Sequence, residues 1–197
     1  MTLVIATMFV STALSAGDSA APTPALLVFA SGPTSVIGQS GQSTLLSKGG
    51  QVRAGDMVRT GPATRAQLRF RDGTYLSLLP GTDLRLDAYR FGSVPKSSEL
   101  AVFTLYRGGA RFQTGSIGKA PGSTFRVATA VAALEGAPCE FVAIAGEGLQ
   151  LRVGAGHVTV RNNAGTLTAA AGQRAMVANA NSPPYLVGTV IPERISP

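Results

Sequence analysis

Residues 66–78 read AQLRFRDGTYLSL, two short runs of alternating apolar and polar residues with an Asp-Gly pair between them. This pattern predicts a β-hairpin, because successive side chains of a strand point to opposite faces and Asp-Gly is a frequent turn pair. A two-residue turn would divide the apolar side chains between both faces. A three-residue loop at 71–73 would bring four of them together: Leu68, Phe70, Leu76 and Leu78. Since one face must be buried, the sequence predicts the longer loop, with Asp72 in the turn and Gly73 in the left-handed conformation of a β-bulge.

Similar runs continue along most of the 197-residue chain. No long segment has the 3.6-residue apolar period of a helix, and turn residues recur about every 8–12 positions. This spacing predicts an all-β fold of many short, mostly antiparallel strands. Residues 128–136 have room for one helical turn. The expected strands are 26–30, 56–60, 66–70, 74–79, 83–89, 99–107, 110–114, 123–131, 139–144, 149–153, 157–162, 166–170 and 174–179.

The chain divides into four expected segments. Residues 1–21 predict a signal peptide, because their uncharged apolar run falls short of the roughly 20 residues that span a bilayer and ends in small residues suited to cleavage. Residues 22–44 predict a loop or linker, 45–180 the β domain, and 181–197 a Pro-rich tail. A signal peptide normally begins with a basic residue, and none precedes Lys48. The alternatives to a typical signal peptide are a translation start farther upstream, or a buried strand or helix. We expect an exported protein of the periplasm or cell surface, with no transmembrane helix in the mature chain.

The charge of the chain restricts its partners. The 17 Lys and Arg residues outnumber the 10 Asp and Glu residues, which gives a net charge of +7. Aromatic residues make up 6% of the chain and do not alternate with the arginines, as a stacking platform for single-stranded nucleic acid requires. We therefore expect no nucleic-acid partner. A basic sheet face suits an acidic protein or glycan, although a solvated face without a partner is the simplest interpretation.

The sequence contains no familiar catalytic or cofactor-binding motif. The Gly-x-Ser-x-Gly, His-Glu-x-x-His and phosphate-loop patterns are all missing. The single histidine, His157, is expected at a strand position, and the single cysteine, Cys139, as a buried thiol, with a reactive thiol as the alternative. The remaining candidates are three carboxylates that no pattern assembles into a pair: Glu135, Glu140 and Glu147. We expect no enzyme activity and no cofactor or metal.

The polar face of the hairpin and of the strand after it predicts an interaction surface. Its candidate residues are Arg69, Arg71, Tyr75 and Arg85. In the strand at 83–89, alternation turns Leu84 and Leu86 inward. It turns Asp83, Arg85 and Asp87 outward, toward Arg69. Exposed ion pairs are worth at most about 1 kcal/mol each, so these charges should adjust the surface and not hold the fold.

The order of these motifs resembles the FecR-like domains, named for the ferric-citrate regulator. Residues 55–86 resemble the start of that domain. The matching positions are Gly55, Asp56, Val58, Thr60, Gly61, Leu68, Phe70, Asp72, Gly73, Leu76, Leu78, Pro80, Leu84 and Leu86. Farther along, LYRGGARF (105–112) resembles a glycine turn between two strands of the family. FRVATAVAAL (125–134) resembles the family's Phe-x-Val-x-Thr-Pro-x-Ala segment. LQLRVGAGHVTVRN (149–162) and LTAAAGQRAMV (167–177) resemble its Gly-x-Val-x-Val and Ala-Gly-Gln closing strands. The chain departs from the family pattern at Ala130, where Pro is usual, and at 135–137.

The resemblance implies an exported domain whose strands stack in a curled sandwich or a solenoid-like sheet. The best-known members pass a receptor signal to a cytoplasmic sigma factor through an N-terminal segment and a membrane helix. This chain matches neither, so we do not expect anti-sigma activity. We expect a non-enzymatic protein-interaction or signalling module of the cell envelope. The alternative is a glycan or peptidoglycan binding module, whose candidate aromatic groove is Tyr75, Tyr89, Phe91 and Tyr106.

Overall fold

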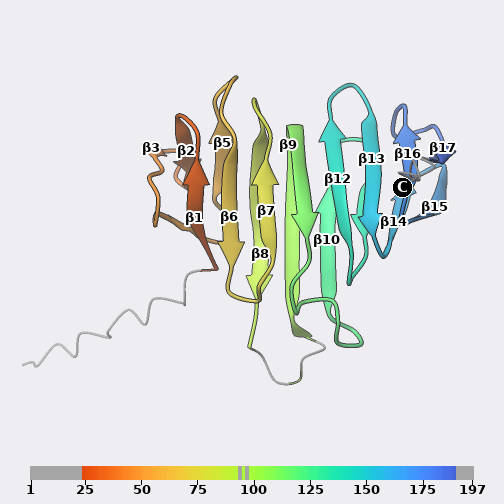
Figure 1. Ribbon diagram of the computed structural model, residues 1–197, viewed down its shortest axis with the longest axis horizontal. Helices are drawn as coiled ribbons and strands as arrows, with labels where there is room; N and C mark the ends of the chain where they lie inside the picture. Colours follow the sequence, from red (N-terminus) through yellow and green to blue (C-terminus); the bar gives the residue numbers. More distant parts are fainter. Residues whose placement is uncertain (1–23, 93–94, 96–97, 190–197) are drawn as a thin grey trace, which may run out of the picture.

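Two layers of β-strands face each other across one hydrophobic core, and one strand belongs to both layers. The computed structural model describes residues 24–92, 95 and 98–189. Figure 1 shows the strands following one another along the long axis of the molecule, from β1–β3 at one end to β14–β17 at the other. The described residues contain no α-helix, and their sheet is curled without closing into a barrel. The predicted all-β fold is confirmed.

Most of the strands are short, and β9 is much longer than the rest. The strands are β1 (Ala25–Ala30), β2 (Thr34–Ile37), β3 (Ser43–Leu45), β4 (Gln51–Val52), β5 (Met57–Thr60), β6 (Ala66–Phe70), β7 (Tyr75–Leu78), β8 (Asp83–Arg90), β9 (Leu100–Gln113), β10 (Thr124–Ala128), β11 (Ala133–Glu135), β12 (Glu140–Ala145), β13 (Leu149–Ala155), β14 (His157–Asn162), β15 (Gly165–Ala170), β16 (Gln173–Val177) and β17 (Tyr185–Thr189).

Strand pairing defines the two layers. Layer 1 has the order β4, β1, β6, β7, β9, β12, β13, β16, β17. Layer 2 has the order β3, β2, β5, β8, β9, β10, β11, β14, β15. Neighbouring strands in these layers are antiparallel, apart from the parallel pair β9–β10. The chain therefore crosses between the layers many times, as a curled sandwich requires.

The hairpin at 66–78 has the predicted register. Leu68 lies opposite Leu76, and the Phe70 N–H donates to the Thr74 carbonyl oxygen at 2.9 Å. Gly73 has a φ of +86°, the left-handed conformation that glycine adopts without steric cost. The apolar side chains of the hairpin and of β8 are buried as expected: Leu68, Phe70, Leu76, Leu78, Leu84 and Leu86.

β9 passes from layer 2 into layer 1. Residues 100–107 pair with β8 and β10, and residues 108–113 pair with β7 and β12. The expected glycine turn between two separate strands is therefore wrong, because the strand continues through Gly108 and only bends there. Gly108 has a φ of +77°, and a Cβ built on it would lie 2.6 Å from the Thr82 Cα. The bend requires glycine because two backbones approach too closely for a side chain.

Two threonine hydroxyls bind the backbone at this bend. The buried Gly109 donates its N–H to the Thr82 Oγ1 at 3.0 Å, and this hydroxyl lies 2.9 Å from the Gly109 carbonyl oxygen. The Thr82 N–H donates in turn to the Thr60 Oγ1 at 2.9 Å. Buried backbone groups need such partners, and the threonines supply them where the strand changes layers.

Aromatic rings from both halves of β9 form the centre of the core. Phe103 and Phe112 have ring centroids 5.9 Å apart, and Phe112 stacks on Phe141 at 4.9 Å. Phe103 also meets the hairpin ring of Phe70 edge to face at 5.5 Å. Aromatic pairs contribute about 0.5–1.5 kcal/mol each beyond the area they bury. These contacts join the two layers around β9.

Some expected segment boundaries differ from the structure. The loop or linker expected at 22–44 contains β1, β2 and part of β3, which pair with the strands of the β domain. The tail expected at 181–197 contains β17, which pairs with β16. Residues 128–136 form a turn and β11 in place of a helical turn. The signal peptide expected at 1–21 lies outside the described residues.

Replacing Gly108 tests the bend. We expect Gly108→Ala to lower the free energy of unfolding by about 2 kcal/mol or more, because an alanine resists the left-handed conformation and its Cβ meets the Thr82 backbone. Gly146→Ala is the matched control, since a Cβ there meets nothing within 4 Å. Urea unfolding measures both variants. Equal stability of the two would contradict this explanation of the bend.

Candidate functional site

The Asp72 carboxylate is buried at the hairpin turn and is used entirely inside the fold. It is 4% exposed and accepts hydrogen bonds from the Thr74 hydroxyl at 2.7 Å, the Thr74 N–H at 3.2 Å and the Ile117 N–H at 3.3 Å. The Tyr89 hydroxyl donates to the same carboxylate at 3.1 Å and accepts from the Asp72 N–H at 3.0 Å. The Asp-Gly turn therefore joins the hairpin to β8 and to the loop after β9, and its carboxylate is not presented to a ligand.

The aromatic residues expected to form a groove do not lie together. The Tyr89 ring packs on Phe70 at 5.6 Å, and burial raises the pKa of its phenol above the ordinary value. Phe91 packs against the core. Tyr75 is exposed on layer 1, and Tyr106 is exposed on layer 2. The expectation of one aromatic groove is therefore wrong.

The four residues of the expected interaction surface are divided between the layers. Arg69 on β6 lies directly opposite Tyr75 on β7, and both side chains are exposed on the outer face of layer 1. Arg71 follows in the exposed turn. Arg85 lies on β8, in layer 2. The structure therefore places Arg69, Arg71 and Tyr75 near one another and Arg85 elsewhere.

Asp83 is buried on layer 2, although its place in the sequence predicted an outward position near Arg69. Its carboxylate accepts two hydrogen bonds from Arg59, at 2.7 and 2.9 Å, and one from Arg107 at 2.9 Å. The hydrogen bond from Arg59, followed by that from Arg107, holds the pKa of Asp83 below its ordinary value. The expectation failed because the turn at 80–82 sends β8 into the layer opposite Arg69.

Arg85 is also occupied within layer 2. It pairs with Asp87, which accepts a further hydrogen bond from the Thr104 hydroxyl at 2.6 Å. The Arg85 guanidinium lies 5.3 Å from the Tyr106 ring centroid, within the range of a cation–π contact. Layer 2 therefore neutralises the charges of its central arginines with its own side chains.

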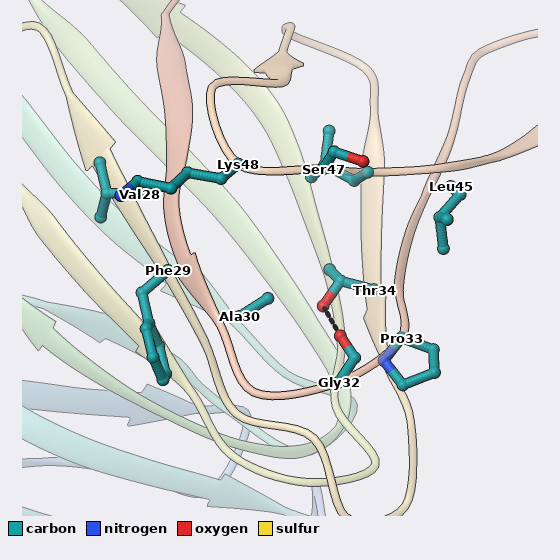
Figure 2. A pocket seen from close by; sticks show the side chains of 10 residues that line it. Val28, Phe29, Ala30, Gly32, Pro33, Thr34, Leu45, Ser47 and Lys48 are labelled. Carbon is teal, nitrogen blue, oxygen red and sulfur yellow. Dashed lines mark hydrogen bonds between the residues drawn. The ribbon is translucent and has the colours of Figure 1, made fainter.

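A pocket of about 490 Å³ lies at the β1–β3 end of the molecule. Figure 2 shows the Lys48 side chain extending toward Val28, with Phe29 and Leu45 at opposite sides of the view. The hydrogen bond drawn there runs from the Thr34 hydroxyl to the Gly32 carbonyl oxygen at 3.4 Å. The lining offers apolar surface, the hydroxyls of Thr34 and Ser47 and the cation of Lys48.

The candidate titratable residues have separate surroundings. Glu140 accepts a hydrogen bond from Arg111 at 2.7 Å, and Glu135 lies 3.7 Å from Arg126. His157 and Glu147 are exposed, with His157 at the start of β14. Among the described residues, no three His, Cys, Asp or Glu side chains group as a metal site would require.

Cys139 is a buried thiol, as the alternation predicts. Its Sγ lies 3.2 Å from the Gly136 carbonyl oxygen. Burial raises the pKa of this thiol to about 11. Because the thiolate is the reactive form, this thiol is protected at neutral pH.

One pair of exposed residues on layer 1 was not expected from the sequence. Arg152 on β13 lies directly opposite Arg174 on β16, and both are exposed. In the sequence, β14 and β15 separate these strands. Alternation within LQLRV (149–153) and QRAMV (173–177) does predict that each arginine points outward. Nothing in the sequence indicates that β13 and β16 pair.

Removing one hydroxyl tests the Asp72 junction. We expect Tyr89→Phe to lower the free energy of unfolding by about 1–2 kcal/mol, because the buried Asp72 loses a donor and its N–H loses an acceptor. Tyr75→Phe removes an exposed hydroxyl that has no hydrogen-bond partner among residues 24–92, 95 and 98–189, and it should change the stability little. Urea unfolding compares the two, and a Tyr89→Phe protein as stable as wild type would disprove the role of this hydroxyl.

Thiol labelling tests the burial of Cys139. The rise of the thiol pKa from 9.0 to about 11 lowers the thiolate fraction at pH 8 by about 100-fold. We therefore expect Ellman's reagent to label the native protein at least about 100-fold more slowly than the urea-unfolded protein. Comparable rates in the two states would show that the thiol is accessible.

Comparisons with known proteins agree with this fold. Two crystal structures of a candidate anti-sigma factor from Parabacteroides distasonis ATCC 8503 match it, with TM-scores of 0.56 and 0.55 and sequence identities of 21% and 20%. Each match covers 67% of this chain and 59% of that chain, so this chain corresponds to less than two thirds of those proteins. A search of curated proteins finds no match.

No helix within residues 24–92, 95 and 98–189 is long and apolar enough to cross a membrane.

A family model identifies the domain. The model described as FecR protein matches residues 56–162, more than half of the chain and the region that contains β9 and strands of both layers. The sequence resemblance is confirmed, and the chain belongs to the FecR family.

Proposed function

We propose that this chain is a non-enzymatic protein-binding module of the cell envelope that acts in signalling. The observation that carries the proposal is the outer face of layer 1. This face presents exposed arginines that no carboxylate of the described residues neutralises: Arg69, Arg152 and Arg174. In a FecR fold, this basic face suits an acidic partner surface.

The use of the carboxylates supports a binding role. Asp72 and Asp83, which are both buried, are engaged by hydrogen bonds inside the fold. Glu140 is paired with Arg111. These side chains hold strands and turns together and are not free to transfer protons to a substrate.

Export to the periplasm or cell surface is part of the proposal. It is supported by the apolar run within residues 1–21 and by membership of the FecR family. Detection of the mature protein in the envelope fraction, with an N-terminus generated by cleavage, would test it. Retention of the full-length chain in the cytoplasm would contradict it.

Capture of the partner tests the function directly. Tagged protein, cross-linked in an envelope extract, should retain a saturable protein partner. Replacing Arg69, Arg71 and Tyr75 together by Gln, Gln and Ala should weaken the capture, because this variant removes two positive charges and an exposed ring. Replacing the exposed Arg65 and Arg161 by Gln gives a control with the same loss of charge. If no partner saturates, the proposed function is wrong.

A single substitution tests the glycan alternative. Of the candidate aromatic residues, Tyr75 is the one exposed on layer 1, where a glycan could stack on it. Binding of the wild-type protein to isolated cell wall, lost in Tyr75→Ala, would favour glycan recognition over protein recognition. We expect no such binding, because the other candidate rings are not beside Tyr75.

A further inference from the structure

The outer face of layer 1 contains a groove that crosses β12, β13, β16 and β17. It has a volume of about 340 Å³. Its lining includes four apolar side chains, two arginines and one amide: Val142, Ile144, Met176, Val187, Arg152, Arg174 and Gln150. We call it the Arg152–Arg174 groove. The strand register puts Val142 opposite Arg152 and Arg152 opposite Arg174, so these three side chains form one row across the sheet.

The apolar part of the groove is open to solvent. Ile144 is 41% exposed and Val187 is 37% exposed. Beside them, Met176 lies opposite Tyr185, whose exposed ring extends the apolar surface along β17. Gln150 lies between Ile144 and Met176 in their cross-strand row, so one amide divides the apolar surface. Exposed apolar surface combined with polar residues is typical of interaction sites.

The two arginines are placed at an energetic cost. Like charges directly opposite each other on antiparallel strands destabilise the pair, and neither Arg152 nor Arg174 has a recorded carboxylate partner within the described residues. The same row shows the contrast. Arg111 also lies beside Val142, and Glu140 neutralises it at 2.7 Å. The sheet thus neutralises one arginine of the row and leaves the adjacent pair for an external anion.

We propose that the Arg152–Arg174 groove binds an extended segment of a partner protein in which acidic residues flank an apolar residue. Each guanidinium can bind a carboxylate with two parallel hydrogen bonds, and the apolar floor can bury the side chain between the carboxylates. The inference rests on the proposed function and specifies the partner's chemistry. It assigns the contact to residues outside the cluster of Arg69, Arg71 and Tyr75.

The shape and composition of the groove favour a polypeptide over other anions. A membrane surface takes up protruding apolar side chains, whereas these line a hollow. Nucleic acids and glycans call for stacking rings over the groove. Its lining has none, and the nearby Tyr185 lies on the edge strand. Carboxylates and an aliphatic or aromatic side chain on one chain satisfy both parts of the lining.

A phage-displayed library of random linear peptides tests the proposal. Panned on the wild-type protein, it should enrich peptides with Asp or Glu on both sides of an apolar residue. A synthetic peptide from the enriched set should bind Arg152→Gln/Arg174→Gln at least about tenfold more weakly, because each charged hydrogen bond contributes about 1.5–3 kcal/mol. Arg65→Gln/Arg161→Gln should bind it within about twofold of the wild type, and replacing the peptide's acids by their amides should abolish binding.

The double variant should fold, since it relieves a like-charge pair. Its melting temperature should be no lower than that of the wild type, which separates lost binding from lost structure. Ile144→Gln, an exposed substitution that keeps both charges, should also weaken peptide binding. Enrichment of peptides without acidic residues, or equal binding to Arg152→Gln/Arg174→Gln, would overturn the proposal.

Two further results separate this inference from its alternatives. Phosphatidylglycerol vesicles that bind wild type but not the double variant, without acidic peptides being enriched, would make the groove a membrane site and overturn the proposal. If the cross-linked envelope partner is captured equally by the wild type and the double variant, the groove proposal fails while the proposed function stands. If no partner is captured at all, the proposed function fails.

Discussion

β9 is shared by both layers, and the remaining pairings of the molecule depend on how it crosses between them. The strand keeps its extended conformation while its partners change from β8 and β10 to β7 and β12. At the crossing, Gly108 removes the steric obstacle, and the Thr82 hydroxyl binds the backbone of Gly109. Phe103 lies before the bend and Phe112 after it, so the same strand supplies rings to the core from both layers. A side chain at Gly108 would therefore disturb the hydrogen bonds and the packing together.

This crossing also explains the distribution of charge. Layer 2 uses its own carboxylates to neutralise its central arginines, with Asp83 held between Arg59 and Arg107 and with Arg85 paired to Asp87. Arg90 and Arg161, nearer the ends of their strands, have no carboxylate partner among the described residues. On layer 1, Glu140 neutralises Arg111 alone. The basic character of the chain is thus available for recognition mainly on the outer face of layer 1. That asymmetry underlies both the proposed protein-binding role and the choice of the Arg152–Arg174 groove.

The alternation of apolar and polar residues predicted the hairpin and most strands. It failed where the structure depends on pairing between strands that are distant in the sequence. The three-residue loop at 71–73 followed from keeping four apolar side chains on one face, and the structure has that register. The two glycines at 108–109 read as a turn because a local pattern cannot distinguish a reversal of the chain from a bend within one strand. β2, β3 and β17 were missed because few of their side chains are buried, so the sequence shows no clear alternation of apolar and polar residues there.

The sequence alone determined the all-β class, the inward set of leucines and phenylalanines, the buried thiol at Cys139 and the resemblance to the FecR family. Each depends on side chains alternating along a single strand, or on the order of motifs along the chain. Only the tertiary structure decided which faces the charged residues share. Arg85 was separated from Arg69, Asp83 was placed beneath two arginines, and Arg174 was brought opposite Arg152. The physical reason is that alternation gives the direction of a side chain only relative to its own strand. Its neighbours on the sheet depend on which strands pair, and many paired strands are separated in the sequence by strands of the other layer.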